Sequence, residues 1–110
     1  MSSLYSQYLK ERLGRGIVET EHGFATFEYI TDKIVYIIDL YVIPEKRKSH
    51  LASDMADEIC RVAKEAGYVQ LLGSVDLNAK GAQTSIKILL AYGMSISHAD
   101  KNAIYFVKDL

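Results

Sequence analysis

The stretch from Asp39 to Asp57 reads DLYVIPEKRKSHLASDMAD, and its pattern decides the fold. It opens as an apolar strand that ends at Pro44, because proline has no N–H to donate to a neighbouring strand. A short basic loop follows, and apolar residues at helical spacing then begin. The free N–H groups in the first turn of a helix bind anions, and the helix dipole supports them. This strand–loop–helix unit therefore predicts a site for a phosphate or pyrophosphate beside four basic side chains: Lys46, Arg47, Lys48 and His50.

The residues before the loop predict an antiparallel meander. Between 17 and 43 the chain reads as three strands, IVET, GFATFEYI and KIVYIIDLYVI, and tight turns are expected at His22-Gly23 and Thr31-Asp32. The third strand, Lys33–Ile43, is apolar on both faces. Strands of that kind are typical of the centre of a sheet, so we expect it to be covered on both sides.

Helical and strand patterns alternate in the rest of the chain. Residues 4–12 predict a short N-terminal helix that ends at Gly14. After the loop, the pattern predicts a helix, a strand, a helix and two short strands, at 49–66, 68–75, 79–92, 94–97 and 103–108. A strand–helix–strand unit in the middle implies a parallel pair with a right-handed crossover. The sequence therefore predicts a mixed α/β fold.

Length and composition limit the kinds of protein that fit. A chain of 110 residues matches one domain, 1–110, and its 49% hydrophobic content excludes intrinsic disorder. A net charge of −1 argues against a nucleic-acid partner. One cysteine cannot form an internal disulfide, and no apolar run approaches the ~20 residues that span a membrane. The N-terminus lacks the apolar core of a signal peptide, so we expect a cytoplasmic location and no membrane partner.

The same segment resembles a known cofactor motif. From Leu40 to Ala52 it reads L-x-V-x-P-x-x-R-x-x-H-x-A, which is similar to L-x-V-x-P-x-x-[QR]-x-x-G-x-[GA] of the GNAT superfamily of N-acetyltransferases. Asn78 follows the next strand, where the family has an asparagine, and Ala91-Tyr92-Gly93-Met94 resembles the family's K-x-G-F. The resemblance implies a GNAT-like fold over 1–110, in which a central mixed sheet carries the antiparallel meander and has helices on both faces.

The resemblance also implies a reaction. A GNAT-like enzyme moves an acetyl group from acetyl-CoA, its co-substrate, to an amine by direct attack, without a metal. The amine is a protein lysine, a protein N-terminus or a small molecule. Acetyl-CoA would lie between the strand ending at Ile43 and the strand ending near Val75. The residues implied to contact it are Leu40, Tyr41, Val42, Arg47, Lys48, Ser49, His50, Leu51, Ala52 and Asn78.

Three departures from the family pattern leave the catalytic groups open. His50 stands where the family has glycine. Leu89 stands where the family has a tyrosine that often acts as the acid for the leaving thiolate. The region before the first strand is also shorter than in the family. Tyr92 is the tyrosine nearest in sequence that can replace the missing acid. Asp39 is a candidate general base or a hydrogen-bonded structural carboxylate. Further candidates for the base or the acceptor site are Glu28 and Tyr41.

A second class of function stays open beside the enzyme. His50 and Leu89 also fit a catalytically inactive GNAT-like module that acts through protein–protein contact. If the protein is an enzyme, the short N-terminal region leaves the acceptor side open for a protein substrate or for the second subunit of a homodimer.

The cysteine and the histidines give no sign of further chemistry. Cys60 has no adjacent histidine and is expected to be a core residue. The three histidines share no metal-ligand spacing.

Overall fold

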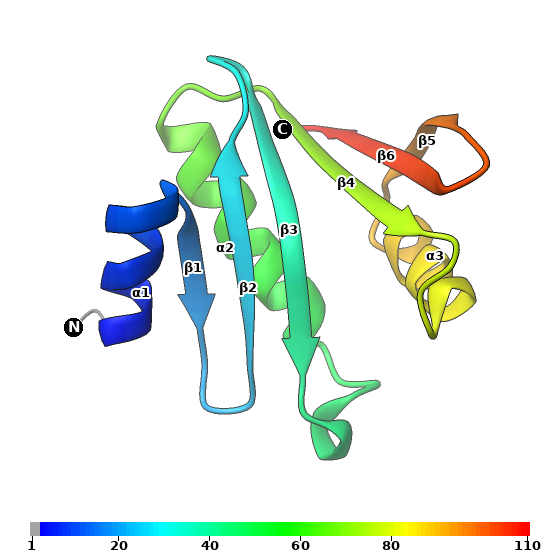
Figure 1. Ribbon diagram of the computed structural model, residues 1–110, viewed down its shortest axis with the longest axis horizontal. Helices are drawn as coiled ribbons and strands as arrows, with labels where there is room; N and C mark the ends of the chain where they lie inside the picture. The colour runs from blue at the N-terminus through cyan, green and yellow to red at the C-terminus, as the bar shows by residue number, and fades with distance from the viewer. Residues whose placement is uncertain (1–2) are drawn as a thin grey trace.

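The structure is a computed structural model that describes residues 3–110. Its six strands form one sheet in the order β1-β2-β3-β4-β6-β5 (Figure 1). The order of elements agrees with the sequence prediction, because tight turns and glycines separate the periodic segments. Along the chain the elements are α1 (Leu4–Tyr8), η1 (Leu9–Leu13), β1 (Gly16–Glu19), β2 (Gly23–Tyr29), β3 (Ile34–Val42), η2 (Pro44–Lys46), α2 (Leu51–Glu65), β4 (Gln70–Asp76), α3 (Ala82–Ala91), β5 (Ser95–Ala99) and β6 (Ala103–Asp109).

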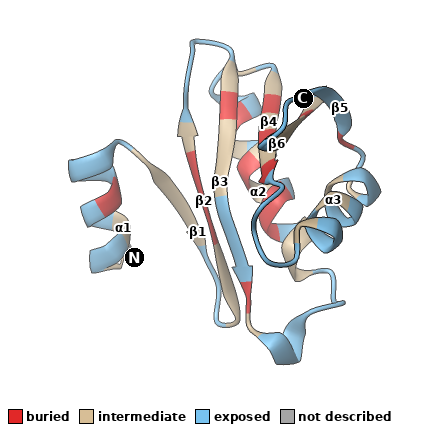
Figure 2. Ribbon diagram, turned by 45° about the vertical axis from the view of Figure 1, so that its right-hand side comes forward, coloured by how far each residue is buried: buried red, intermediate tan, exposed pale blue. Residues whose placement is uncertain are grey.

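The sheet is mixed, and the predicted mixed α/β fold is confirmed. Strands β1, β2 and β3 form the antiparallel meander, β3 and β4 are parallel, and β4, β6 and β5 are antiparallel neighbours. In both views β1 runs between α1 and α2 (Figures 1 and 2). The helix α2 lies behind β2 and β3 in Figure 1 and packs against both strands. It begins two residues later than predicted, at Leu51, so that Ser49 and His50 belong to the loop.

The strands β3 and β4 stay together over a short distance. Their pairing joins Ile34 to Gln70, Val35 to Leu71 and Tyr36 to Leu72, and among residues 3–110 no further pair of the two strands is joined. Strand β3 continues for six more residues and β4 for four. Because the two strands are parallel, their carboxyl ends lie at the same edge of the sheet. Figure 1 shows that the strands diverge there.

The prediction that β3 is covered on both sides is wrong for its second half. Residues Asp39, Leu40 and Tyr41 are exposed, and Figure 2 shows this part of β3 in pale blue. The exposed fraction is 39% for Leu40 and 44% for Tyr41. The apolar pattern is the same along the whole strand, but beyond Tyr36 the strand has no β4 neighbour.

A bulge in the meander accompanies this separation. Thr26 is opposite Asp39 and Phe27 is opposite Ile37, which leaves one extra residue on β3. Thr26 is 2% exposed, and its hydroxyl oxygen accepts a hydrogen bond of 3.1 Å from the backbone N–H of Asp39. Bulges bend a strand and increase its twist. The bulge therefore lies at the point where β3 continues without its parallel neighbour.

The hydrophobic core lies between the sheet and the buried face of α2. Met55, Ile59 and Ala63 of this helix are at most 1% exposed, and they belong to one cluster with Val35 and Leu71 of the sheet. Val35 and Leu71 are both fully buried and are directly paired. Since side chains alternate between the two faces of a strand, their neighbours Tyr36 and Leu72 point to the face away from α2.

We expect the substitution Ile59→Ala to destabilise the fold strongly. Ile59 is fully buried, and removing a buried isoleucine to the β-carbon costs about 2–5 kcal/mol because it leaves a cavity. The matched control is Ile88→Ala on α3, where the side chain is 50% exposed and the cost should stay below about 1 kcal/mol. Urea unfolding of both variants measures the difference, and equal losses would contradict the position of the core.

Candidate functional site

The exposed half of β3 presents a free backbone edge. Leu40 to Val42 are paired on one side with β2, where Gly23 is opposite Val42. On the β4 side no strand of the described residues meets them. A Cβ added at Gly23 would lie 2.4 Å from the carbonyl oxygen of Tyr41, so glycine is what allows β2 to approach this closely. The edge can therefore pair with an extended ligand that carries amide groups.

Arg47 fixes the loop after β3 to the strand. Its Nε donates a hydrogen bond of 2.9 Å to the carbonyl oxygen of Val42, and its guanidinium carbon lies 5.6 Å from the centre of the Tyr41 ring. The side chain thus turns back toward β3. Lys48 then has a φ of 67°, a left-handed conformation that reverses the chain direction before α2.

The start of α2 offers a group of free N–H donors. Between residues 47 and 53, Arg47 donates its N–H to the carbonyl oxygen of Pro44 at 3.3 Å, and Leu51 donates to the hydroxyl oxygen of Ser49 at 3.3 Å. The other backbone N–H groups of this segment have no partner in the described part of the chain: Lys48, Ser49, His50, Ala52 and Ser53. Because α2 is 15 residues long, its dipole adds partial positive charge at this end. The geometry suits an anion.

His50 stands directly before α2, and its side chain makes no capping hydrogen bond to the helix. Its carbonyl oxygen accepts hydrogen bonds from the N–H of Asp54 at 2.9 Å and from the hydroxyl of Ser53 at 3.0 Å. The imidazole is exposed. It therefore lies at the rim of the N–H group and leaves the backbone donors of the next residues free.

Asn78 lies across the gap from the loop after β3. It lies two residues after Asp76, the last residue of β4, and its backbone N–H donates a hydrogen bond of 2.8 Å to the carboxylate of Asp76. Its side chain is exposed. Because β3 and β4 are parallel, Asn78 and the loop at Arg47 lie at the same edge of the sheet. The predicted cofactor residues thus lie at the carboxyl ends of the two strands, where β3 and β4 are no longer paired.

Asp39 lies on the exposed half of β3, where its carboxylate has no hydrogen bond or ion pair to any residue in 3–110. The sequence analysis expected a covered strand around it, in which an unpaired carboxylate would be costly. The strand is exposed there, so that cost does not arise. Its role as a general base stays a prediction.

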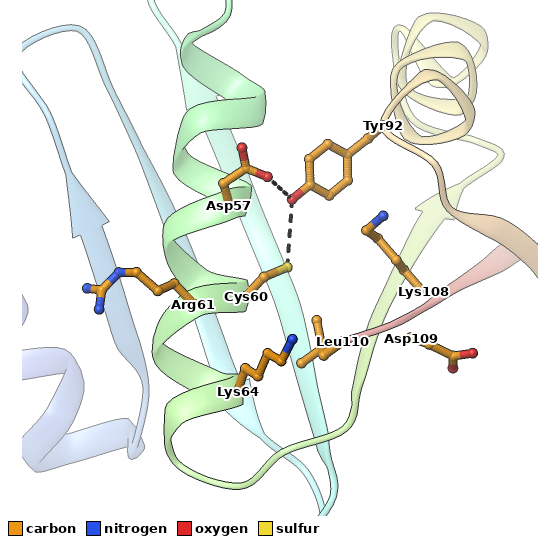
Figure 3. A pocket seen from close by; sticks show the side chains of 8 residues that line it. All are labelled: Asp57, Cys60, Arg61, Lys64, Tyr92, Lys108, Asp109 and Leu110. Carbon is orange, nitrogen blue, oxygen red and sulfur yellow. Dashed lines mark hydrogen bonds between the residues drawn. The ribbon is translucent and has the colours of Figure 1, made fainter.

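Tyr92 lies in a different place, between α2 and the end of α3 (Figure 3). Its hydroxyl donates a hydrogen bond of 2.6 Å to a carboxylate oxygen of Asp57 and lies 3.7 Å from the sulfur of Cys60. Burial raises the pKa of the Tyr92 phenol, and the hydrogen bond to Asp57 raises it further. The side chain lines a cavity of about 370 Å³ whose lining residues are Asp57, Cys60, Arg61, Lys64, Tyr92, Lys108, Asp109 and Leu110.

That cavity includes none of the predicted cofactor residues, so the structure does not bring Tyr92 together with them. Tyr92 follows the helix that the family motif closes, but its ring points toward α2 in Figure 3. Cys60 is half-buried beside it, and burial raises the pKa of the Cys60 thiol. A raised pKa leaves little thiolate at neutral pH, which agrees with a packing role for this cysteine.

The side chains of the two further candidates contact residues other than those of the gap. Glu28 forms an ion pair with Arg15, with 3.7 Å between the carboxylate oxygen and Nε. Tyr41 has one face near the Arg47 guanidinium and contacts Phe24 at 6.0 Å between ring centres. It also lines a second cavity of about 370 Å³ at the β1–β2 turn.

One contact across the gap is not predicted from the sequence. The hydroxyl of Tyr36 on β3 and the hydroxyl of Ser74 on β4 form a hydrogen bond. The two residues are 38 positions apart, so no local pattern links them. The usable signal is alternation: Tyr36 and Ser74 each follow a residue of the buried face, which places both on the opposite face.

The described residues contain neither a group of metal ligands nor a membrane-spanning helix. Within 3–110 there is no group of three or more His, Cys, Asp or Glu side chains that could hold a metal ion. In the same range no helix has the length and apolar character needed to cross a membrane.

Comparisons with known proteins bear on the family and the fold. Residues 8–84 match the model of the acetyltransferase (GNAT) family. A search of curated proteins finds no match. Among solved structures, the PaiA N-acetyltransferase from Thermoplasma acidophilum in complex with coenzyme A is similar, with a TM-score of 0.79, 14% identity, and coverage of 94% of this chain and 66% of that one.

Two other structures are similar in the same way. A GNAT family acetyltransferase from Elizabethkingia anophelis with acetyl-CoA bound has a TM-score of 0.75 and 12% identity, covering 100% of this chain and 84% of that one. Ard1 from Thermoplasma volcanium has a TM-score of 0.68 and 17% identity, covering 81% and 63%. The chain thus spans less than two thirds of the length of Ard1 and of PaiA. With a family match over more than half of its length and a matching fold, the chain belongs to the GNAT acetyltransferase family.

Proposed function

We propose that the protein is an N-acetyltransferase that moves an acetyl group from acetyl-CoA to an amine. One observation carries the proposal. Strand β3 leaves β4 after Tyr36, and the free edge that results leads directly to the N–H donors at the start of α2. Such an opening accepts a long ligand that has amide groups along its arm and a pyrophosphate at its end, which is the chemistry of coenzyme A.

Each part of the opening suits one part of that ligand. The backbone of Leu40, Tyr41 and Val42 would pair with the amides of the pantetheine arm. The free N–H groups between Lys48 and Ala52 would hold the pyrophosphate, since anions bind at a helix N-terminus. Asn78 would contact the arm from the β4 side. These assignments use the family motif and the geometry together.

The reaction itself needs three things. The attacking amine must lose its proton, the oxyanion of the intermediate needs a donor, and the thiolate must leave. We assign the first role to Asp39, because its exposed carboxylate lies on the same stretch of β3 as the cofactor edge. Tyr92 can serve the thiolate only if its hydrogen bond to Asp57 breaks, and it stays a prediction.

The acceptor is an amine of a protein or a small molecule. The described N-terminal segment, α1 and η1, lies beside the edge strand β1 and leaves the gap between β3 and β4 uncovered (Figure 1). A protein surface or a second copy of the chain can therefore reach the gap. The homodimer of the sequence analysis stays a prediction.

We expect acetyl-CoA and CoA to raise the melting temperature of the protein. A ligand at 100 times its dissociation constant adds about 2.7 kcal/mol to the free energy of unfolding, which amounts to several degrees in a domain of this size. ATP is the control, because it carries phosphates but no pantetheine arm. A thermal unfolding series with the three ligands makes the measurement. No shift with CoA or acetyl-CoA would favour the inactive binding module.

We expect the substitution Lys48→Gln to weaken CoA binding. Lys48 is exposed in the loop beside the free N–H groups, and a charge-assisted hydrogen bond to phosphate contributes about 1.5–3 kcal/mol. The dissociation constant should rise about tenfold or more in isothermal titration. Lys101→Gln, in the turn between β5 and β6, is the matched control and should leave the affinity unchanged. Equal affinities of the two variants would place the pyrophosphate elsewhere.

Turnover separates the enzyme from a module that only holds the cofactor. The assay follows the release of CoA thiol with acetyl-CoA and a set of amines: a lysine-containing peptide, a peptide with a free N-terminus, a polyamine and an aminoglycoside. Acceleration by one of them supports the N-acetyltransferase. Binding of CoA without turnover on any of them would leave the cofactor site in place and remove the catalytic role.

A further inference from the structure

We propose that the hydroxyl of Tyr36, held by Ser74 where β3 and β4 separate, donates a hydrogen bond to the sulfur of coenzyme A as the thiolate leaves. This makes Tyr36 a catalytic residue of the reaction. The inference rests on the proposed function and names a group that neither the family motif nor Tyr92 supplies.

The hydroxyl of Tyr36 lies where the gap between β3 and β4 begins. Tyr36 is the last residue of β3 that is paired with β4, and its partner in the pairing is Leu72. Its side chain nevertheless reaches Ser74, two residues further along β4. At that level the two strands are no longer joined. The Tyr36–Ser74 hydrogen bond therefore spans the narrow end of the opening.

A ligand in the gap can reach the hydroxyls of Tyr36 and Ser74. Val35 and Leu71 are fully buried against α2, so the next residue on β3 and every second residue on β4 point to the other face. Tyr36 and Ser74 are both only half-buried there. A hydroxyl pair on this face can meet a ligand in the gap, while an acceptor amine approaches from the same open side.

The sulfur of bound coenzyme A would lie at the narrow end of the gap. The anion site at the start of α2 lies at the wide end of the gap, beyond Val42. From there the free edge of β3 runs six residues back to Tyr36, about 20 Å for an extended strand. A pantetheine arm that pairs with this edge has its pyrophosphate end at α2, and its thiol end therefore points toward the narrow end. The Tyr36 hydroxyl is the polar group of β3 that meets it there.

Acetyl transfer places negative charge on the sulfur of coenzyme A. The amine nitrogen attacks the acetyl carbonyl carbon, the C–S bond breaks and its electron pair stays on sulfur. The surplus proton of the amine leaves to the base, and the CoA thiolate remains. Either hydroxyl of the Tyr36–Ser74 pair can be the donor. When Ser74 donates to the Tyr36 oxygen, the Tyr36 proton is free to point at the developing negative charge, which a placed donor stabilises.

The test measures the thiol of bound CoA directly and needs no acceptor. Carbon-13 NMR of CoA labelled at the carbon bonded to sulfur follows the thiol as pH is changed, in complexes with the wild type, Tyr36→Phe and Ser74→Ala. A hydrogen bond to the thiolate lowers the thiol pKa, so Tyr36→Phe should raise it by about one pH unit relative to the wild-type complex. Ser74→Ala should give a smaller rise in the same direction.

The matched control is Tyr105→Phe. Tyr105 lies on β6 directly opposite Ser74 and stacks on His98, away from the gap, so its removal should leave the thiol pKa unchanged. Titration of each variant with CoA checks that affinity changes by less than about twofold. If Tyr36→Phe binds CoA with the wild-type thiol pKa, the role of Tyr36 is overturned and the cofactor site stands. If the wild type binds no CoA, both the site and this inference are overturned.

Discussion

The early end of the pairing between β3 and β4 is the constraint on which the rest of the site depends. Three residues of each strand are joined, and beyond Tyr36 and Leu72 the carboxyl ends diverge. Parallel strands that stayed paired to their ends would satisfy each other's backbone groups and leave no edge for a ligand. The free edge of β3 is therefore a property of the backbone, and the proposed ligand contacts depend on it.

Two features keep the strands together at one end and apart at the other. At the joined end, Val35 and Leu71 are fully buried and pack with Ile59 of α2, so burial of apolar surface holds the pair. At the other end, the bulge opposite Thr26 bends β3, and the exposed backbone there can hydrogen-bond to water. Because the free edge faces solvent, leaving it unpaired costs little.

The sequence predicts the elements better than the site. Periodicity and turn residues predict the order of helices and strands, and Pro44 with the basic loop predicts the start of α2 and the proposed anion site there. The same reasoning predicts a fully covered β3, because alternation reports which residues are apolar and not which neighbour is present. Leu40 has the pattern of a core residue, yet it is 39% exposed, since the paired strand has already turned away.

The catalytic groups show the same limit. The sequence points to Tyr92 because it lies beside a family motif in the chain, but the orientation of its side chain depends on Asp57, which lies 35 residues earlier on another element. The Tyr36–Ser74 hydrogen bond joins two neighbouring strands that are separated along the chain by the crossover helix α2. Contacts of this kind arise from tertiary packing, and local spacing carries no information about them.

The two halves of β3 have different roles. The first half of β3 contributes to the core, so substitutions at Val35 act on the free energy of unfolding. In the second half Asp39, Leu40 and Tyr41 are exposed, so substitutions at Asp39 or Leu40 can change ligand contacts without a large loss of stability. Tyr36 lies at the boundary, where its backbone is fixed by pairing while its side chain reaches into the opening. A group that must be held precisely against a reacting atom gains from that position, because the rigid half of the strand restricts its motion.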